Sequence, residues 1–455
     1  MHDQFEGTLT ARDCKRHLPF RFEVPEGTGA LEIAFSFAPC RGQGIANMLT
    51  LTLFDPDGFR GAGHRGGATH RIRIDAASAT PGYLPGPLTP GAWRVEIDTH
   101  MIMPGAPVRY TLEIVLLEAA DEVVHRPSTT PIRQASTPVK AEPGWYRGDL
   151  HTHSHHSDAA RDFTVSDMAR LAKDFDLDFF FLTDHNTNAG LVSGDAPLDR
   201  VPLVGRGIEL TTFWGHALCL GTDRWIDWRV RPGTGAMARS AETARRDGQI
   251  FVIAHPMAEG DPGCTGCAWR FGAMMPGNAR YVEVWNGPWA GDSNNEAALA
   301  LWYDWLNQGR RMVATAGTDV HGAIPAGVTP GFSVIHAEAL SEAALLDGLR
   351  AGHLYLSAGP ALRLEAEDGG GRRMMMGDTV TEPATFRVAW EAVPAGGEVR
   401  LLVNGRLLTA IPTESAGAYR WAMGPTEADW VVAEARGEDG ALLAVTNPIF
   451  LDLED

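Results

Sequence analysis

Residues 148–160 read GDLHTHSHHSDAA, and this stretch decides the interpretation of the whole chain. A strand-like run leads into it, and four histidines then fall within six residues, with one carboxylate on either side. These residues are Asp149, His151, His153, His155, His156 and Asp158. A helical run at 164–175 follows, with Thr164 as its candidate N-cap, and a second strand-like run comes at 176–185. Strand, helix and strand in succession indicate parallel strands with crossover helices, as in an α/β barrel.

The same alternation continues outward over residues 139–362, and nearly every apolar run in it ends in a histidine or a carboxylate. The residues at these ends are His151, His153, Asp184, His185, Glu209, His216, His255, Asp319 and His321. The carboxyl ends of parallel barrel strands converge on one face, so these side chains are expected to meet there. Residues i and i+2 of a strand point the same way, so His151 with His153, and Asp319 with His321, can each aim two ligands at one point.

Imidazole and carboxylate ligands without thiolate suit Zn, Mn or Fe. A lone histidine at a strand end is usually structural, but a set of them at successive strand ends favours metal binding. We therefore predict a multinuclear site in which Glu209 bridges two ions.

Both flanks of this central part have a different pattern. Residues 1–138 and 363–455 alternate short apolar runs with Gly and Pro turn signals, which predicts a β-sandwich domain on each side. Residues 126–144 are rich in Pro, Ser and Thr and are typical of a linker. The expected organisation is an N-terminal sandwich at 1–138, a metal-binding barrel at 139–362 and a C-terminal sandwich at 363–455.

The bulk composition excludes some classes of function. The 455-residue chain has a net charge of -18, which argues against a nucleic-acid partner. It has no apolar run of about 20 residues to span a membrane, and its first residues do not resemble a signal peptide. We therefore expect a cytoplasmic protein that acts on a small molecule. The oligomeric state stays open.

Five ordered motifs resemble the PHP (polymerase and histidinol phosphatase) superfamily of metallohydrolases over residues 145–360. They are GDLHTHSHHSD, LTDHN, GIEL, AHP and AGTDVH. Four further segments look like one branch, the CehA/McbA-type enzymes, which include carbaryl hydrolase. These are ATPGYLPGPLTPGAWRVEI, WGHALCLG, GDPGCTGCAW and VEVWNGPW. The resemblance implies a distorted (β/α)7 barrel between the two sandwiches.

The resemblance also implies a role for each ligand. His151, His153, Glu209 and Asp319 would hold a first ion. Glu209 would bridge to a second ion, completed by His255 and His216, and Asp158, His185 and His321 would hold a third. Many superfamily members have a histidine where this chain has Asn286, so two-metal and three-metal versions both stay open.

The expected reaction is hydrolysis by a hydroxide that bridges two of the ions. Glu209, His216 and Asp184 are the predicted catalytic residues, with Asp184 as an orienting partner of a metal histidine. The general acid stays open between His155, His156 and a metal-bound water. The predicted substrate is a phosphoester. The alternatives are a carboxylic or carbamic ester, and a catalytically silent binding protein.

Several residues near the motifs are candidate substrate contacts. They are His155, His156, Arg206, Trp214, Trp285 and Asn286. Arg161, Arg206 and Arg270 could hold an anionic substrate, although most arginines are solvated surface residues. Tryptophans at strand ends are equally typical of core packing. The lone CTGC motif of Cys264 and Cys267 leaves a loop role, a disulfide and a metal or redox role open.

Overall fold

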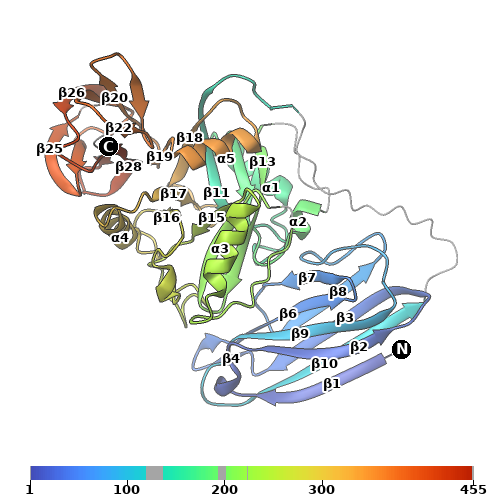
Figure 1. Cartoon of the computed structure of the whole chain (residues 1–455). Helices are drawn as coiled ribbons and strands as arrows, with labels where there is room; N and C mark the ends of the chain where they lie inside the picture. The colour runs from blue at the N-terminus through green and yellow to red at the C-terminus, as the bar shows by residue number, and fades with distance from the viewer. Residues whose placement is uncertain (1, 119–136, 193–200, 223, 414, 453–455) are drawn as a thin grey trace.

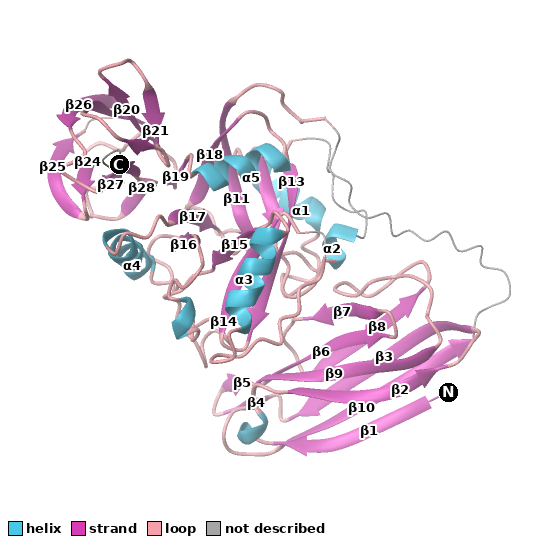
Figure 2. Cartoon of the chain, viewed as in Figure 1, coloured by secondary structure: helices cyan, strands magenta, loops and turns pink. Residues whose placement is uncertain are grey.

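The computed structural model describes residues 2–118, 137–192, 201–222, 224–413 and 415–452. It is a mixed α/β structure in which strands predominate (Figure 2). In Figure 1 the N-terminal strands (blue) lie on one side of the central strands (green to yellow), and the C-terminal strands (orange to red) lie on the other. The predicted domain boundaries at 138 and 362 stay predictions, and residues 126–136 of the expected linker lie outside the described residues.

The N-terminal region consists of two four-stranded antiparallel sheets. The first has the order β1 (His2–Leu9), β10 (Val108–Glu118), β3 (Thr28–Ala38) and β8 (Thr69–Asp75). The second has the order β2 (His17–Val24), β9 (Gly91–Met101), β6 (Met48–Asp55) and β7 (Gly58–Gly63). A small pair, β4 (Arg41–Gly42) with β5 (Ile45–Ala46), and a 3-10 helix at Ala11–Asp13 lie outside them.

The two sheets bury their apolar faces against each other. Strand β8 alternates strictly between exposed and buried residues, as the period of two requires. Phe35 from the first sheet and Leu51 and Trp93 from the second belong to one buried cluster. This is the sandwich that the alternating sequence pattern predicts.

His70 on β8 makes this sandwich sensitive to acid. Burial, with a smaller contribution from nearby arginines, lowers the pKa of His70 from 6.5 to about 4. The unfolded chain therefore binds a proton at this position between pH 6.5 and 4 and the folded chain does not, so stability is lost as the pH falls through that range. The native protein should therefore lose about 2 kcal/mol more of its free energy of unfolding between pH 7.5 and pH 5 than the His70→Gln variant does. Urea unfolding at the two pH values checks this, and an unchanged difference between the two proteins would refute it.

The central sheet runs through nine neighbouring strands. Their order is β17 (Val313–Gly317), β16 (Tyr281–Asn286), β15 (Ile250–Ile253), β14 (Gly215–Leu220), β13 (Leu203–Thr212), β12 (Phe179–Leu182), β11 (Gly144–Thr152), β18 (Phe332–Ala337) and β19 (Leu354–Ser357). The α-helices of the described residues are α1 (Val165–Asp174), α2 (Ala189–Val192), α3 (Ala236–Arg246), α4 (Asn295–Asn307) and α5 (Glu342–Ala351). A second 3-10 helix spans Gly272–Met274. Thr164 caps α1 in a capping box with Asp167, as expected.

Strand direction in this sheet differs from the mostly parallel arrangement that the sequence predicts. The pairs β11–β12, β12–β13, β15–β16 and β16–β17 are parallel, but β13–β14, β14–β15, β11–β18 and β18–β19 are antiparallel. The β13–β14 hairpin arises because Thr212 pairs with Gly215 across a two-residue turn. Gly215 has φ +136, and a Cβ there would lie 2.8 Å from the ring of Trp269, so this turn requires glycine.

The central sheet curls so that its far strands approach each other. The Asp319 N–H, just after β17, donates to the His151 carbonyl (2.8 Å), and the His153 N–H donates to the Val320 carbonyl (3.1 Å). These bonds join the ends of β11 and β17, which are six strands apart in the sheet order. The carboxyl ends of β12, β13, β15 and β16, and the amino end of the antiparallel β14, therefore surround a common space.

The C-terminal region corrects the expectation of a separate sandwich in one respect. One of its layers is a sheet of its own, with the order β21 (Arg373–Met375), β20 (Ala361–Asp368), β23 (Ala384–Glu391) and β26 (Gly417–Met423). The other layer continues the central sheet from β19 through β28 (Leu442–Thr446), β27 (Trp430–Arg436), β24 (Glu398–Val403) and β25 (Arg406–Pro412). The short pair β22 (Thr379–Val380) and β29 (Ile449–Leu451) joins it. Because β19 pairs with β28, the two regions share a sheet.

The N-terminal sandwich contacts the central region beside the β13–β14 turn. Lys15 Nζ donates to the Phe213 carbonyl (2.8 Å) and pairs with Asp261 (2.6 Å). Arg229 pairs with the buried Glu96 (3.1 Å). The sandwich is thus held against the end of the central sheet where the ligand-type side chains lie. No helix among the described residues has the length and apolarity to cross a membrane.

Candidate metal centre

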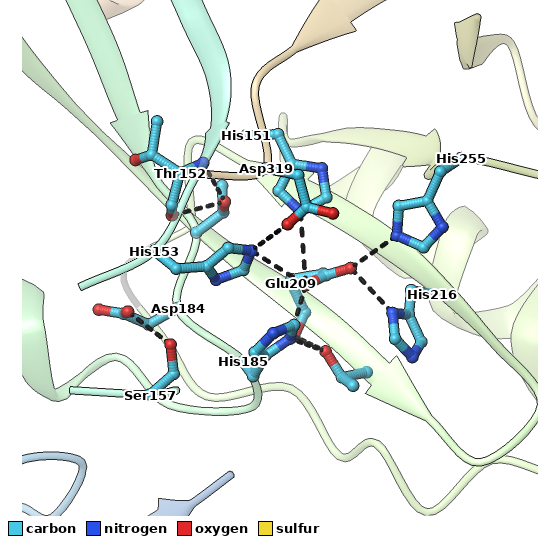
Figure 3. Close-up of polar contacts among 12 residues, drawn as sticks. His151, Thr152, His153, Ser157, Asp184, His185, Glu209, His216, His255 and Asp319 are labelled. Atoms are coloured by element: carbon cyan, nitrogen blue, oxygen red, sulfur yellow. Dashed lines mark hydrogen bonds and ion pairs between the residues drawn. The ribbon is translucent and has the colours of Figure 1, made fainter. Parts of the chain in front are cut away.

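Glu209 on β13 is a fully buried carboxylate surrounded by histidines (Figure 3). Its Oε2 lies 2.6 Å from His185 Nδ1 and 3.4 Å from His151 Nε2. Its Oε1 lies 3.1 Å from His216 Nδ1 and 3.3 Å from His255 Nε2. Each oxygen therefore faces imidazoles from different strands, which is the position of a carboxylate that two ions share.

The predicted ligands come together because most of them lie close to a strand end. His151 is the second-last residue of β11 and His153 follows that strand, His216 is the second residue of β14, and His255 follows β15. Asp319 follows β17 and has φ +54, and His255 has φ +29. A positive φ is uncommon for residues other than glycine, and such backbone conformations concentrate at functional sites.

Three overlapping groups of side chains each place their ligand atoms within 4.8 Å of one another. They are His151, His153 and Asp319; His151, Glu209 and His255; and His153, Asp158, His185 and His321. His216 joins them through its contact with Glu209. All nine residues predicted as ligands thus lie in one continuous cluster. In a fourth group, His17, Glu96 and Asp98, the carboxylate of Glu96 already pairs with Arg229 and Arg94, and Asp98 pairs with His17.

Unpartnered polar atoms inside the cluster indicate that it fits cations. His151 Nε2, Asp158 Oδ1 and Glu209 Oε2 face other ligand-type groups, are buried and have no hydrogen-bond partner among the described residues. A buried polar atom without a partner costs about 1–3 kcal/mol. Divalent ions between the imidazoles and carboxylates would remove that cost, and the donor set is one that Zn, Mn and Fe accept.

The charges within the cluster are strongly coupled. Burial opposes ionisation of Glu209, but His185, His151 and His216 outweigh it and hold its pKa well below the ordinary value. Burial likewise lowers the pKa of His151, but Asp319, Glu283 and Glu209 reverse this and raise it well above 6.5. The pKa of His321 rises to about 9 because Asp158 and Asp319 outweigh burial. Metal ions must displace these protons, so they bind more weakly as the pH falls.

Glu283 is a site residue that the sequence reading missed. It is buried on β16, and its carboxylate lies 3.0 Å from His151 Nδ1. It also accepts hydrogen bonds from the His255 backbone N–H (3.0 Å) and from Asn286 Nδ2 (3.1 Å). Metal-binding histidines usually have such a carboxylate on their other nitrogen. The available signal was a single charged residue inside the apolar strand YVEVWN.

Asp149 supports the same strand end from the opposite side. Its carboxylate accepts from the Thr318 hydroxyl (2.6 Å), the Thr318 N–H (3.0 Å) and the His151 N–H (3.1 Å). Burial raises the pKa of Asp149 to about 7 despite these bonds. It ties the end of β11 to the end of β17.

Asp184 corrects a predicted catalytic role. Its carboxylate accepts from the Ser154 N–H (2.7 Å), the Ser154 hydroxyl (2.8 Å) and the Ser157 hydroxyl (2.8 Å). It therefore holds the loop after β11, and among the described residues its hydrogen bonds go to Ser154 and Ser157 rather than to a predicted ligand histidine. Adjacent residues at a strand end point in opposite directions, so Asp184 and His185 face different surroundings.

Arg206 and Trp285 are also placed differently from their predicted substrate contacts. Arg206 forms a bidentate ion pair with the buried Glu342 of α5 (2.9 Å). Trp285 is completely buried in the main apolar cluster, and its indole N–H donates to the Gly287 carbonyl (3.0 Å). Both side chains are thus used by the fold.

The other predicted contacts lie near the cluster in different ways. Asn286 Nδ2 lies 3.3 Å from Asp319 Oδ2 and so supports that ligand. His156 is buried, and its Nδ1 accepts from the Gly82 N–H of the N-terminal sandwich (3.2 Å). His155 is partly exposed and lines a cavity. Trp214 lies beneath Lys15 Nζ (4.5 Å) at the domain contact.

The N-terminal sandwich adds a histidine that the sequence reading missed. His64, directly after β7, is buried, and its ring lies 4.5 Å from the ring of His185. Its Nδ1 has no hydrogen-bond partner among the described residues. No local signal marks it, because the contact joins two separate domains.

The CTGC motif forms a loop beside the cluster. Cys264 and Cys267 are joined in a disulfide, which is one of the alternatives that the sequence left open. Gly266 between them has φ +83, and a Cβ there would lie 3.3 Å from His216 Nε2. The loop thus covers His216.

Comparisons with known proteins give only distant similarities. No family model matches the chain, and no curated protein matches it. Among solved structures, it resembles a two-domain protein from Bacteroides vulgatus that contains a predicted PHP-like metal-dependent phosphoesterase. The identity is 15%, the match covers 70% of this chain and 99% of that one, and the TM-score is 0.39.

A second solved structure is named as a metal-dependent phosphoesterase from Bifidobacterium adolescentis. The identity is 17%, the match covers 41% of this chain and 92% of that one, and the TM-score is 0.27. Neither similarity is strong enough to assign a family. The case for a function therefore rests on the geometry of the cluster.

Proposed function

We propose that this protein is a metal-dependent hydrolase of phosphoesters, of the PHP type and most similar to its CehA/McbA branch, with its curled sheet as a distorted (β/α)7 barrel. It would be a cytoplasmic enzyme that acts on a small molecule. One observation carries the proposal: a single buried carboxylate, Glu209, lies within 3.4 Å of histidines from four segments of the sheet.

Each ion has a defined set of proposed ligands. His151, His153, Glu209 and Asp319 would hold the first, and Glu209, His216 and His255 the second. Asp158, His185 and His321 would hold a third, with His153 close to them. The site would take two or three ions of Zn, Mn or Fe.

When bound, such ions supply an activated water as nucleophile and neutralise negative charge on the attacked ester. The chain itself supplies rigid positioning. Glu283 fixes the ring of His151 and the backbone of His255, and Asn286 holds the second oxygen of Asp319. Asp184 keeps the loop that carries Asp158 in place through Ser157. These contacts hold the ligands ready, so little reorganisation accompanies the reaction.

The surroundings favour a phosphoester over a carboxylic or carbamic ester. Trp285, which would have suited an aryl group, is completely buried, and Trp214 packs under Lys15. Arginines, in contrast, line the cavity next to Asp158. Guanidinium groups pair well with anionic groups, so a substrate that carries negative charge next to the attacked group suits these surroundings better than a neutral ester.

A small substrate panel tests this proposal. We expect the Mn- or Zn-loaded protein to hydrolyse p-nitrophenyl phosphate or bis(p-nitrophenyl) phosphate at least about 100-fold faster than p-nitrophenyl acetate or an aryl carbamate. Prior removal of metal by a chelator should abolish turnover, and adding the ion back should restore it. Faster turnover of the carbamate would contradict the phosphoesterase and support a hydrolase of the carbaryl-hydrolase type. If the metal-loaded protein hydrolysed none of these substrates, the result would support a binding protein without catalytic activity.

A further inference from the structure

A cavity of about 600 Å³ lies between the N-terminal sandwich and the loop after β11. Both domains contribute to its walls. The lining residues that matter here are Arg65, Thr69 and Arg71 from the sandwich, and His155, Asp158 and Arg161 from the loop. Its volume is within the range of sites for small organic molecules.

The cavity adjoins the metal centre. Asp158 lines it, and its Oδ1 lies 3.0 Å from His321 Nε2 and 3.2 Å from His185 Nε2. The wall is held by contacts between the domains, since the Gly82 N–H donates to His156 and Arg65 donates to the Pro81 carbonyl (2.7 Å) and the His155 carbonyl (3.3 Å). A molecule bound at the cluster would therefore extend into a preformed space.

The charge in this cavity is mostly positive. Three arginines face one carboxylate, Asp158, whose charge a bound ion would offset. Arg71 and Arg161 form no ion pair among the described residues, although the chain as a whole is strongly acidic. Arg65 and Arg161 also contribute to the low pKa of His70 in the wall, after the larger effect of burial. Unneutralised arginines beside a cavity favour an anionic occupant.

We infer that this cavity binds a second anionic group of the substrate, a carboxylate or phosphate on the part of a phosphoester that is not attacked. The inference rests on the proposed function for the reacting phosphoryl group. Arg71 and Arg161 contact the second anion, and Arg65 shapes the wall. The substrate class is therefore a small phosphoester with at least one further negative charge.

Binding of phosphonates to the metal-loaded protein tests this without turnover. The probes are ω-carboxyalkylphosphonates of three to six carbons and the alkylphosphonates of equal length, which lack the carboxylate. Isothermal titration calorimetry measures the affinities. We expect the best ω-carboxyalkylphosphonate to bind about 10-fold more tightly than the alkylphosphonate of equal length. Alkane bisphosphonates of the same lengths determine whether a phosphate is preferred to a carboxylate.

Variants connect the preference to the arginines. Arg71→Gln with Arg161→Gln should abolish the 10-fold difference and leave alkylphosphonate binding and metal content unchanged. The control is Arg246→Gln with Arg373→Gln, which removes the same charge at exposed positions outside the cavity and should keep the difference. Equal binding of both probes by the native protein, or an unchanged preference in the cavity variant, would overturn the inference.

A kinetic comparison separates this inference from the proposed function. Glycerol 2-phosphate and 2-phosphoglycerate differ by one carboxylate, and we expect a lower KM for the second, which the cavity variant should lose. Hydrolysis of both with equal KM would support the phosphoesterase and overturn the anion site. No hydrolysis, with the phosphonate preference intact, would overturn the phosphoesterase and support the anion site.

Discussion

Replacing Glu209 with Gln is expected to remove at least one ion per chain and to lower kcat/KM by about 1,000-fold. The amide keeps the size of the side chain but cannot be negative, and its nitrogen would face at least two of the five surrounding histidines. An NH2 group also cannot bind a cation, so one half of the bridge is lost. Elemental analysis and steady-state kinetics on the purified variant measure both effects.

A matched variant controls for the loss of a buried carboxylate. Glu434 is also buried, but it pairs with Arg436 and Tyr303 at the contact between α4 and the C-terminal strands. Glu434→Gln should lower the unfolding midpoint and leave metal content and turnover per folded molecule unchanged. A Glu209→Gln protein with full metal content and activity would rule out the bridging role.

Replacing Glu283 with Gln is expected to weaken metal binding by about 10- to 100-fold. The carboxylate serves three donors, namely His151 Nδ1, the His255 N–H and Asn286 Nδ2. A glutamine has one acceptor oxygen, so at least one of these donors loses its partner. His151 would then lose its fixed orientation and part of its basicity, although Glu283 is not one of the proposed ligands.

Competition with a chelator measures the affinity, and unfolding of the metal-free protein measures general stability. If Glu283 positions the ligands, Glu283→Gln should weaken metal binding even where the unfolding midpoint of the metal-free protein is unchanged. Glu342→Gln is the control, since this buried carboxylate pairs with Arg206 away from the cluster. Metal affinity within threefold of the native value in Glu283→Gln would contradict the positioning role.

The cluster of candidate ligands was predictable because metal ligands of this kind follow a simple spatial rule. They lie at the ends of strands, and pairs such as His151 and His153 have the spacing of a shared strand face. The structure brings all nine predicted ligands into one cluster. Repetition of the pattern along the chain was the decisive signal.

The supporting residues were harder to predict because their partners are far apart in sequence. Glu283 lies 132 residues from His151 in the sequence. Arg206 lies 136 residues from Glu342, and its ion pair with Glu342 takes the guanidinium away from the predicted substrate contact. A single sequence does not distinguish a tryptophan of the core from a tryptophan that lines a pocket, and Trp285 belongs to the core. Arg71 and His64 belong to a different domain, so only the tertiary structure brings them to the site.

Strand direction was predicted incorrectly for a local reason. Alternating strands and helices indicate parallel pairing, but the two-residue turn after Thr212 forces β14 to run back along β13. The helix α5 also joins two antiparallel strands, β18 and β19. A helical connection therefore permits parallel pairing without requiring it.

The most direct test of the central claim is to locate and count the ions in the purified protein. Elemental analysis gives ions per chain, and anomalous diffraction at the metal absorption edge gives their positions. The account predicts two or three ions per chain, with two of them on opposite oxygens of Glu209. Less than one ion per chain after loading with Zn or Mn, or ions bound away from Glu209, would contradict it.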